Sequence, residues 1–359
     1  MKRNIFRIVY MITAMLFMAV FFAGCSQGSQ IAGNNEKLQI VTTIFPVYDW
    51  VENVLGDNPA GAEVTMLLDN GVDLHSFQPT AEDIVKISTC DVFIYVGGES
   101  DEWVEDALQE AVNKDMVVIN LMDVIGNRAK EEEFVEGMQE DSHEHEEHED
   151  ADHEDHEEHE DADHEDAGHE EEHHHDEEEA EYDEHIWLSL QNAEICVNII
   201  SEKLSEKDPV NKEVYTNNAM QYNSELKSLD EKYRDVAENA DVKTLLFADR
   251  FPFRYLTEDY GLDYYAAFIG CSAETEASFE TVTFLANKTD ELGLKHILVI
   301  ESSDGKIAET VISNTKEKNQ QICRMDSLQS VTAKDKESGV TYLSVMQNNL
   351  EVLKEALSQ

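Results

Sequence analysis

Basic residues are scarce in this chain of 359 residues, which has 26 Lys and Arg against 78 Asp and Glu. Between Glu131 and Glu184 there is no Lys or Arg at all, although this stretch holds 31 acidic residues and 11 histidines. The formal net charge is -52, so the rest of the chain is acidic as well. Such a chain repels nucleic acids and anionic membranes and attracts cations. We therefore expect a cationic ligand and no nucleic-acid partner.

Apolar residues are nearly missing from the same stretch, so residues 131–184 cannot build a core and are expected to form a disordered loop. Carboxylates and imidazoles in solvent hold divalent transition metals, and imidazole suits zinc, copper, nickel and iron. Solvation alone would explain the acidity, but it explains the histidines poorly. The alternatives are a charge-repelling spacer and a low-affinity metal collector. The collecting histidines would be His143, His145, His148, His153, His156, His159, His164, His169, His173, His174 and His175.

Long apolar runs are missing except at the N-terminus. Basic residues there precede an apolar stretch at positions 8–22, and Ala23-Gly24-Cys25 follows. The stretch is short of the ~20 residues that a membrane-spanning helix needs, although such a helix is the alternative. The pattern resembles a bacterial lipoprotein signal. We expect residues 1–24 to be the signal peptide, Cys25 to carry the lipid and residues 25–37 to form a linker. The protein would then be lipid-anchored on the outer face of the cell membrane, or periplasmic.

Cysteine is sparse, and no CxxC pair occurs. The four residues beyond the proposed lipid site are widely spaced. We expect them to be buried free thiols, with one disulfide as the alternative outside the cytoplasm. They are Cys90, Cys196, Cys271 and Cys323.

The remaining sequence alternates β-rich runs with helical patterns, which predicts parallel sheets. In the first half the strands are expected at Leu38–Thr43, Glu63–Leu68, Asp91–Val96 and Val117–Leu121. Helices are expected at Pro46–Leu55, after an N-cap at Thr80, and at Trp103–Val112. In the second half the strands are expected at Thr244–Phe247, Tyr264–Phe268, Ile297–Ile300 and Ile322–Met325, and the helices at Ser278–Leu292, Lys306–Asn319 and Val340–Leu357.

Two helical patterns separate these halves. One has an apolar period over His185–Leu204, and the other is long and mostly polar over Asn211–Asn239. The long one would span about 40 Å and suits a strut between two lobes. We therefore expect an α/β protein with an N-terminal lobe at 38–208, a linking helix at 209–240 and a C-terminal lobe at 241–359.

Metal-capable side chains follow several of these strands. Because open α/β sheets bind ligands beyond the carboxyl ends of their strands, His75, Asp249 and Asp326 become candidate ligands. His185 joins them because it stands next to Ile186-Trp187-Leu188, which would hold it on an ordered element. The plainer alternatives are a solvated His75, a His185 that merely ends the acidic run, and an Asp326 that caps a helix. We interpret His296, beside a buried strand, as structural.

These segments resemble the metal-binding solute-binding lipoproteins of zinc and manganese ABC importers. The resemblance rests on Asp73-Leu74-His75-Ser76-Phe77-Gln78-Pro79, His185-Ile186-Trp187-Leu188 and Asp326-Ser327. It implies metal ligands at His75, His185 and Asp326, and two α/β lobes joined by one long rigid helix with the metal site between the lobes. A His-rich acidic loop before the second ligand is similar to the zinc members rather than the manganese members.

One position departs from this family. Its third ligand is a His or Glu three residues before a Phe-x-Tyr motif, and here that position is Arg250. A guanidinium is always protonated and has no lone pair to offer, so Arg250 cannot ligate. Three replacements remain open, namely Asp249, a histidine of the acidic run, or water as in open zinc sites. Asp249 is our preferred hypothesis.

The expected function is capture without catalysis. The resemblance implies a monomeric extracytoplasmic protein that binds Zn(II) as transported ligand and delivers it to an ABC-transporter permease with its ATPase. Manganese is the alternative metal. A surface zinc buffer or adhesin-like protein without a transporter is one rival. A zinc hydrolase with metal-activated water is another.

Overall fold

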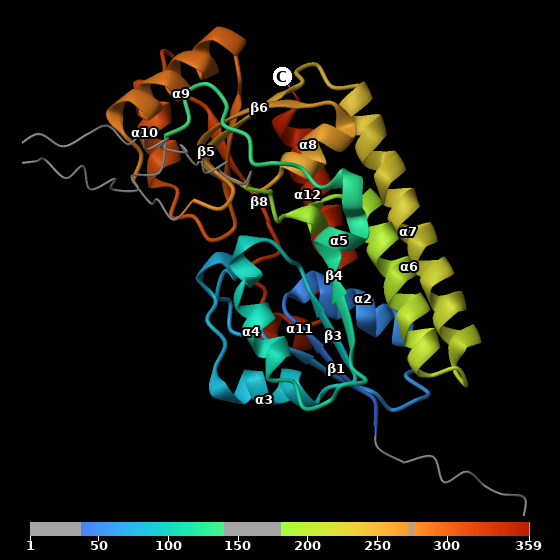
Figure 1. The fold of residues 1–359 in the computed structure, drawn as a ribbon. Coiled ribbons are helices and arrows are strands. Elements are labelled where there is room, and N and C mark those ends of the chain that lie inside the picture. Colours follow the sequence, from blue (N-terminus) through green and yellow to red (C-terminus); the bar gives the residue numbers. More distant parts are fainter. Residues whose placement is uncertain (1–36, 140–180, 273–275, 359) are drawn as a thin grey trace, which may run out of the picture. The chain divides into compact units, whose positions relative to one another are not determined.

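Short runs of β-branched and aromatic residues form the sheets of this protein, of which a computed structural model describes residues 37–139, 181–272 and 276–358. The N-terminal lobe has a parallel sheet with the strand order β2-β1-β3-β4 (Figure 1). Its strands are β1 Gln39–Thr42, β2 Glu63–Met66, β3 Val92–Tyr95 and β4 Val117–Asn120. The central strands β1 and β3 are almost wholly buried, as expected where helices cover both faces of a parallel sheet.

Helices and short 3₁₀ turns connect these strands. The helices are α2 Phe45–Leu55, α3 Ala81–Thr89, α4 Trp103–Gln109 and α5 Leu121–Ile125. The 3₁₀ turns are η2 Leu74–Ser76, η3 Glu99–Asp101, η4 Gly126–Arg128 and η5 Ile186–Leu188. The predicted cap at Thr80 is confirmed, because its hydroxyl accepts from the Asp83 N–H and the Asp83 carboxylate accepts from the Thr80 N–H.

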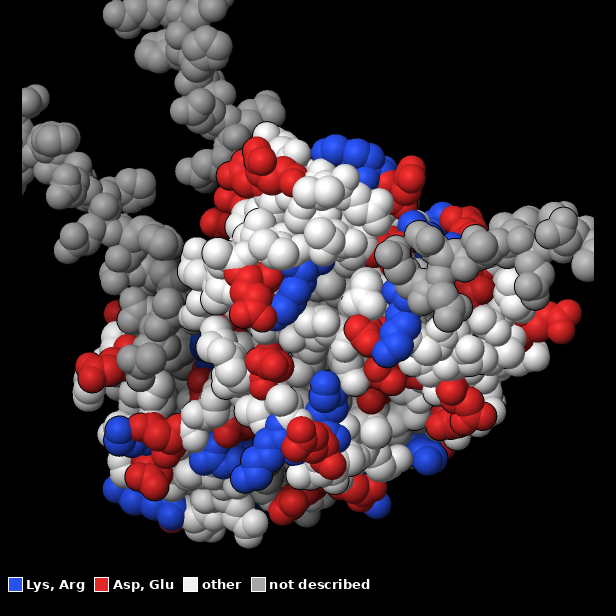
Figure 2. All heavy atoms as spheres, turned by 90° about the horizontal axis from the view of Figure 1, so that it is seen from below, with Lys and Arg blue, Asp and Glu red and all other residues white. Residues whose placement is uncertain are grey.

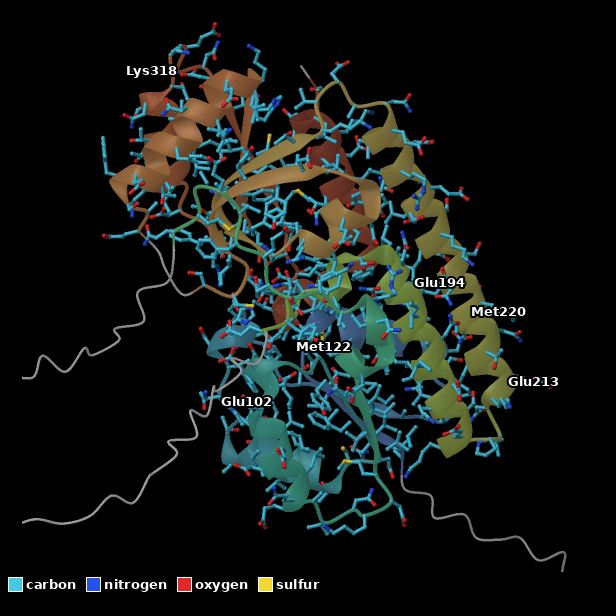
Figure 3. The ribbon with its side chains drawn as sticks, turned by 45° about the horizontal axis from the view of Figure 1, so that its top comes forward. Glu102, Met122, Glu194, Glu213, Met220 and Lys318 are labelled. Carbon is cyan, nitrogen blue, oxygen red and sulfur yellow. The ribbon has the colours of Figure 1, made fainter. Side chains whose placement is uncertain are left out.

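A helical hairpin links the lobes. It consists of α6 Leu190–Lys207 and α7 Lys212–Glu238, which lie along each other (Figure 1). The 27 residues of α7 span about 40 Å, as predicted for a strut. One side of α7 is buried, and α2 and α6 contact it in one part while α8 and α12 contact it in another. On the outer side Glu213 and Met220 project away from the lobes (Figure 3).

The C-terminal lobe repeats the architecture with the parallel strand order β6-β5-β7-β8. Its strands are β5 Thr244–Phe251, β6 Asp263–Ile269, β7 His296–Ile300 and β8 Gln321–Met325. Its helices are α8 Arg254–Tyr260, α9 Phe279–Leu292, α10 Lys306–Asn314, α11 Ala333–Glu337 and α12 Tyr342–Ala356. Successive side chains of a strand point to opposite faces. Thus Leu246 and Ala248 pack in a core with α9 and α10, whereas Leu245 and Phe247 pack in the main core.

That main core runs through both lobes without a break. It includes residues of β1, β3, α2, α6, α7, β5 and α12. At its centre the rings of Trp50 and Tyr342 lie 5.4 Å apart, and the Tyr342 hydroxyl donates to the carbonyl of Trp187 at 2.6 Å. The Trp187 indole N–H in turn donates to the carbonyl of Ser327 at 2.8 Å. These contacts tie the two lobes and the start of α6 into one packed unit.

Some element boundaries differ from the predictions. The predicted strand at Thr244–Phe247 continues to Phe251 through a register irregularity, so Asp249 and Arg250 lie within β5 and not after it. The helix predicted from His185 begins at Leu190, because Ile186–Leu188 form a 3₁₀ turn and Ser189 caps the new helix. The helix predicted over Lys306–Asn319 ends at Asn314, where the following residue is extended.

The predicted loop at residues 131–184 is ordered at both ends. Glu131 and Tyr182 form a β-bridge, and the Gln139 N–H donates to the carbonyl of Ala267 in the C-terminal lobe at 2.9 Å. The eleven candidate collecting histidines, the signal peptide and Cys25 lie outside the described residues. Within the described ranges no helix has the length and apolar character needed to cross a membrane.

The described cysteines are free thiols, and the surface carries charges of both signs. The four described cysteines are free, as predicted, and all are buried except Cys271, which is half-buried. On the face shown in Figure 2, acidic and basic side chains are interspersed with uncharged ones, and neither sign forms a continuous patch.

Candidate metal centre

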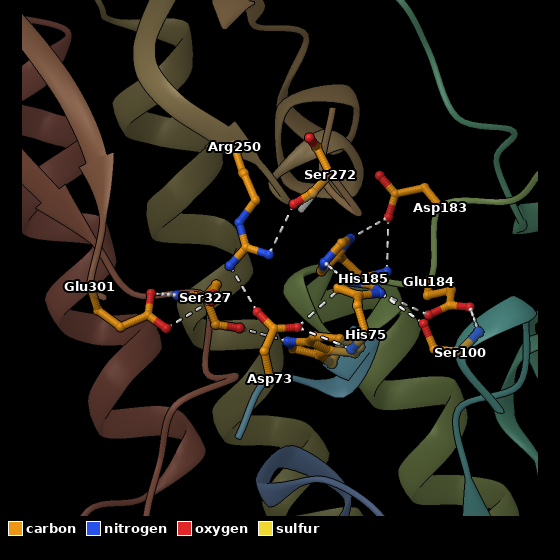
Figure 4. Close-up of polar contacts among 11 residues, drawn as sticks. Asp73, His75, Ser100, Asp183, Glu184, His185, Arg250, Ser272, Glu301 and Ser327 are labelled. Atoms are coloured by element: carbon orange, nitrogen blue, oxygen red, sulfur yellow. Dashed lines mark hydrogen bonds and ion pairs between the residues drawn. The ribbon is translucent and has the colours of Figure 1, made fainter. Parts of the chain in front are cut away.

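Two imidazoles from distant parts of the sequence meet where the lobes join. His75 lies on η2, and the Asp73 carboxylate caps this turn. Nδ1 of His75 is 2.8 Å from the Ser100 hydroxyl. His185 precedes η5, is fully buried, and has its Nδ1 2.9 Å from Asp183. Each ring therefore uses Nδ1 for a hydrogen bond. The two Nε2 atoms face each other at 3.2 Å (Figure 4).

This spacing has a chemical meaning. A tetrahedral zinc ion holds imidazole nitrogens at ~2.0–2.1 Å, so two nitrogens on it are about 3.3–3.4 Å apart. The Nε2 atoms of His75 and His185 are 3.2 Å apart, which is close to this nitrogen–nitrogen distance. A carboxylate or hydroxyl on the opposite nitrogen fixes the ring and its tautomer, as is usual for metal-binding histidines. The pair is thus oriented to chelate one ion.

Protons compete for the same nitrogens. Burial opposes a charge on His185, but Asp183, Glu132 and Glu184 together outweigh it and raise the pKa of this imidazole. Burial and the neighbouring His185 lower the pKa of His75 to about 3. A proton taken up by the pair therefore goes to His185 rather than to His75. A metal ion has to displace that proton.

Buried carboxylates surround the pair. Glu184 Oε2 and Glu132 Oε1 are buried without a hydrogen-bond partner, and Glu184 Oε2 lies 3.5 Å from Nδ1 of His75. The other oxygen of Glu184 accepts from the Ser100 N–H at 2.7 Å. Gly98 permits this approach, because a Cβ there would lie 2.4 Å from Glu184 Oε1. Burial raises the pKa of Glu184 to about 7. Unpaired carboxylate oxygens beside two imidazoles favour a cation.

A cavity of about 470 Å³ opens onto His75. The described residues that line it include five glutamates and neither Lys nor Arg, namely Glu99, Glu102, Glu132, Glu181 and Glu184. An acidic lining raises the local concentration of cations. The cavity thus gives a cation a path to His75.

Cys271 is a third side chain at this site, and no sequence motif pointed to it. Its sulfur and a ring nitrogen of each of His75 and His185 all lie within 4.8 Å of one another. Burial and the Glu132 carboxylate raise the pKa of this thiol. Cys271 stands two residues after the end of β6, so the same rule that selected Asp249 after a strand would have found it.

The two predicted aspartates lie apart from this cluster. Among the described residues, neither Asp249 nor Asp326 has its carboxylate within that 4.8 Å group. One oxygen of Asp249 accepts from the Arg250 N–H at 2.9 Å, and the other is buried without a partner. Asp326 lines a separate cavity with Glu301, and burial together with Glu301 raises its pKa to about 6. The structure therefore brings His75 and His185 together without either aspartate.

Arg250, where the resemblance implies a third ligand, contacts both sides of the site. Its guanidinium donates to Asp73 at 2.8 Å and to the carbonyl of Ser272 at 3.4 Å (Figure 4). Asp73 caps the turn that carries His75, and Ser272 follows Cys271. Arg250 thus holds two loops, one from each lobe, at the imidazole pair.

Fold and site together define a two-lobed α/β binding protein with a candidate cation centre at the junction of its lobes. The model of one protein family, described as zinc-uptake complex component A, periplasmic, matches residues 40–356. The chain belongs to this family. The predicted class and the expectation that it is a transport component rather than an enzyme agree with that membership. Members of this family act outside the cytoplasm.

Individual relatives are similar over almost the whole chain. The zinc-binding lipoprotein AdcA of Streptococcus pneumoniae is 30% identical over 345 residues, which is 95% of this chain and 59% of that protein. The high-affinity zinc uptake system protein ZnuA of Bacillus subtilis is 28% identical over 349 residues, 97% of each chain. This chain spans about 60% of the length of the streptococcal relatives.

Solved structures of relatives share the two-lobe fold. The Zn(II)-bound ZnuA-like domain of Streptococcus pneumoniae AdcA has a TM-score of 0.64 at 26% identity, with 90% of this chain and 100% of that domain covered. The metal-dependent lipoprotein YcdH of Bacillus subtilis has a TM-score of 0.66 at 25% identity, with 89% and 99% covered.

Proposed function

We propose that this protein captures Zn(II) outside the cytoplasm and delivers it to a membrane permease of the ABC type. The observation that carries the proposal is the pair of Nε2 atoms of His75 and His185, 3.2 Å apart and surrounded by buried carboxylates. Imidazole nitrogen suits zinc better than it suits manganese. The zinc-binding relatives support the same metal.

In this proposal the ion enters through the acidic cavity and displaces the proton of the imidazole pair. His75 and His185 bind it directly, and Asp183 stabilises the His185 ring in the ligating orientation. Asp326 contributes only when the lobes move closer, since its carboxylate lies outside the cluster. The shared core limits that motion to a modest adjustment.

The acidic, His-rich run would act as an accessory collector. Its carboxylates raise the local cation concentration and its imidazoles give weak coordination. Lipid attached to Cys25 would keep the monomeric protein near the permease and its ATPase.

The experiment is a calorimetric titration of zinc and of manganese into the chain from Ser26, which contains the whole compact unit from Leu38 onward. A second version lacks Asp141–Glu179. We expect one tight zinc site in both proteins and loss of weak, multiple binding in the shortened one. If tight binding disappears with the run, the site between the lobes is not the capture site, and the chain is a metal buffer.

A further inference from the structure

The proposed zinc site has two protein ligands, His75 and His185, and it needs at least a third. A structural zinc ion has four ligands, and open sites keep three from the protein. The residue at the family's third ligand position is Arg250, which cannot ligate and is paired with Asp73 at 2.8 Å. A third protein ligand therefore has to come from another part of the chain.

Cys271 is placed to supply it. We propose that the sulfur of Cys271 is the third protein ligand of the zinc ion held by His75 and His185, an inference that rests on the proposed function. Among the described residues, these three form a group of potential ligands whose binding atoms all lie within 4.8 Å of one another. On a tetrahedral zinc ion with Zn–S of ~2.3 Å, sulfur and nitrogen are about 3.6 Å apart. A shift of roughly 1 Å thus brings the thiol into place.

The local backbone is built for this approach. Gly270 packs directly on His185, because a Cβ at Gly270 would lie 2.9 Å from Cε1 and 3.1 Å from Nδ1 of that ring. Such distances exclude any other residue unless the imidazole moves. The glycine therefore lets the end of β6 carry the next residue, Cys271, against the imidazole pair.

Arg250 then has a positioning role in place of ligation. It contacts the carbonyl of Ser272 beside Cys271 and the carboxylate of Asp73 beside His75 (Figure 4). The Asp73 carboxylate offsets the positive charge of the guanidinium beside the site. In this proposal Cys271 ligates and Arg250 positions the two loops, and together they replace the single histidine or glutamate that ligates at the Arg250 position in the family.

The ligation step balances in protons. The Zn–S bond forms as the S–H bond of Cys271 breaks, and a coordinated thiol is deprotonated outright by the ion. The proton passes to the Glu132 carboxylate, with which the Cys271 side chain is hydrogen-bonded, and then to solvent. No oxidant or reductant takes part.

A thiolate also sets the choice of metal. Sulfur is a soft ligand that favours zinc or Cu(I), whereas manganese prefers carboxylate, carbonyl and water. Replacing an oxygen ligand by the sulfur of Cys271 therefore discriminates against manganese. The acidic cavity concentrates both cations, and the sulfur selects zinc among them.

The test uses zinc and cobalt(II) with the chain from Ser26, its Cys271→Ala variant and, as matched control, Cys90→Ala. Cys90 is buried in the N-terminal lobe, where its sulfur contacts Met116. We expect Cys271→Ala to weaken zinc binding by about 10- to 100-fold or more, since even supporting partners of zinc ligands contribute that much. Manganese affinity should change less, and Cys90→Ala should leave zinc affinity unchanged.

The unsubstituted protein gives an independent result that does not depend on how a variant folds. Its cobalt(II) form should show the near-ultraviolet charge-transfer absorption of a thiolate ligand, and zinc should protect Cys271 from alkylation. Tight zinc binding without these two signatures, or with unchanged affinity in folded Cys271→Ala, overturns the inference and leaves the proposed function standing. Absence of any tight zinc site in the unsubstituted protein overturns the proposed function itself.

Discussion

At the scale of single residues, the two histidines of the site differ in how they are held. His185 is fully buried, and both its backbone N–H and its ring contact Asp183. His75 keeps 12% of its side chain exposed and faces the acidic cavity. In the proposed function the first is therefore the fixed ligand, and the second meets the incoming ion. Asp183 matters because a ring free to turn would no longer present Nε2 to His75.

Substitution of the fixed histidine should therefore remove the tight site. We expect His185→Gln to abolish tight zinc binding, and Asp183→Asn to weaken it by about 10- to 100-fold because the ring loses its partner. Calorimetry measures both. His296→Gln is the control, since this histidine lies at the start of β7 in a separate group of potential ligands with Cys323 and Glu355. Wild-type affinity in His185→Gln would contradict the assignment.

Zinc affinity should also depend on pH. The raised pKa of His185 means that its nitrogen is protonated at a higher pH than a free imidazole, whose pKa is about 6.5. As the pH falls, protons therefore displace zinc earlier than for ordinary histidine ligands. Chelator competition between about pH 8 and about pH 6 measures this. Asp183→Asn should move the loss of affinity to lower pH. A flat profile in the unsubstituted protein would refute the competition.

At the scale of elements, the hairpin of α6 and α7 sets where the lobes stand. The buried side of α7 repeats at helical spacing, with Tyr215, Ala219, Tyr222, Leu226, Leu229 and Tyr233 facing the rest of the molecule. Its opposite side is polar or solvent-exposed. Because η5 and α6 directly follow His185, packing of the hairpin also fixes the position of this ligand.

Two substitutions on α7, one on its buried side and one on its exposed side, should differ in their effect on the free energy of unfolding. Leu226 is 1% exposed and Met220 is 59% exposed. We expect Leu226→Ala to lower the free energy of unfolding by about 2–5 kcal/mol, because it leaves a cavity in the core. Met220→Ala should change it by no more than about 0.5 kcal/mol. Denaturant unfolding measures both, and equal effects would show that α7 is not packed as described.

At the scale of the whole molecule, the shared core holds a buried acid that is not part of the proposed metal site. Asp49 of α2 accepts hydrogen bonds from the Tyr222 hydroxyl at 3.1 Å and the Asn53 side chain at 3.0 Å. Burial raises its pKa from 3.8 to about 6. The folded protein therefore binds a proton between these values that the unfolded chain does not bind. The cost of the buried charge is present above about pH 6 and is lost as the pH falls toward 3.8.

Without zinc, the protein should therefore gain stability in mild acid. For Asp49 alone the gain from neutral pH to about pH 4 is on the order of 3 kcal/mol. Thermal unfolding with a chelator present should show this gain reduced in Asp49→Asn and retained in Asp57→Asn, which changes an exposed acid of the same region. With zinc the trend should reverse, because acid releases the stabilising ion. Identical profiles for Asp49→Asn and the unsubstituted protein would contradict this account.

The sequence by itself determined the alternation of strands and helices, the long linking helix and the family. These follow from apolar periodicity, capping residues and short motifs, all of which are local in the chain. It also pointed to His75 and His185, because each stands in a distinctive segment. Strand ends were less certain, and the extension of β5 to Phe251 depends on pairing with Phe268 and Ile269 of β6.

Only the tertiary structure decided which side chains meet. That His75 and His185 face each other at 3.2 Å, that Arg250 joins Asp73 to Ser272, and that Cys271 lies beside the imidazoles are consequences of how two sheets meet. These residues are separated by up to 199 positions in the sequence, from Asp73 to Ser272. Local patterns cannot encode such distances, because they depend on the packing of elements that are remote along the chain.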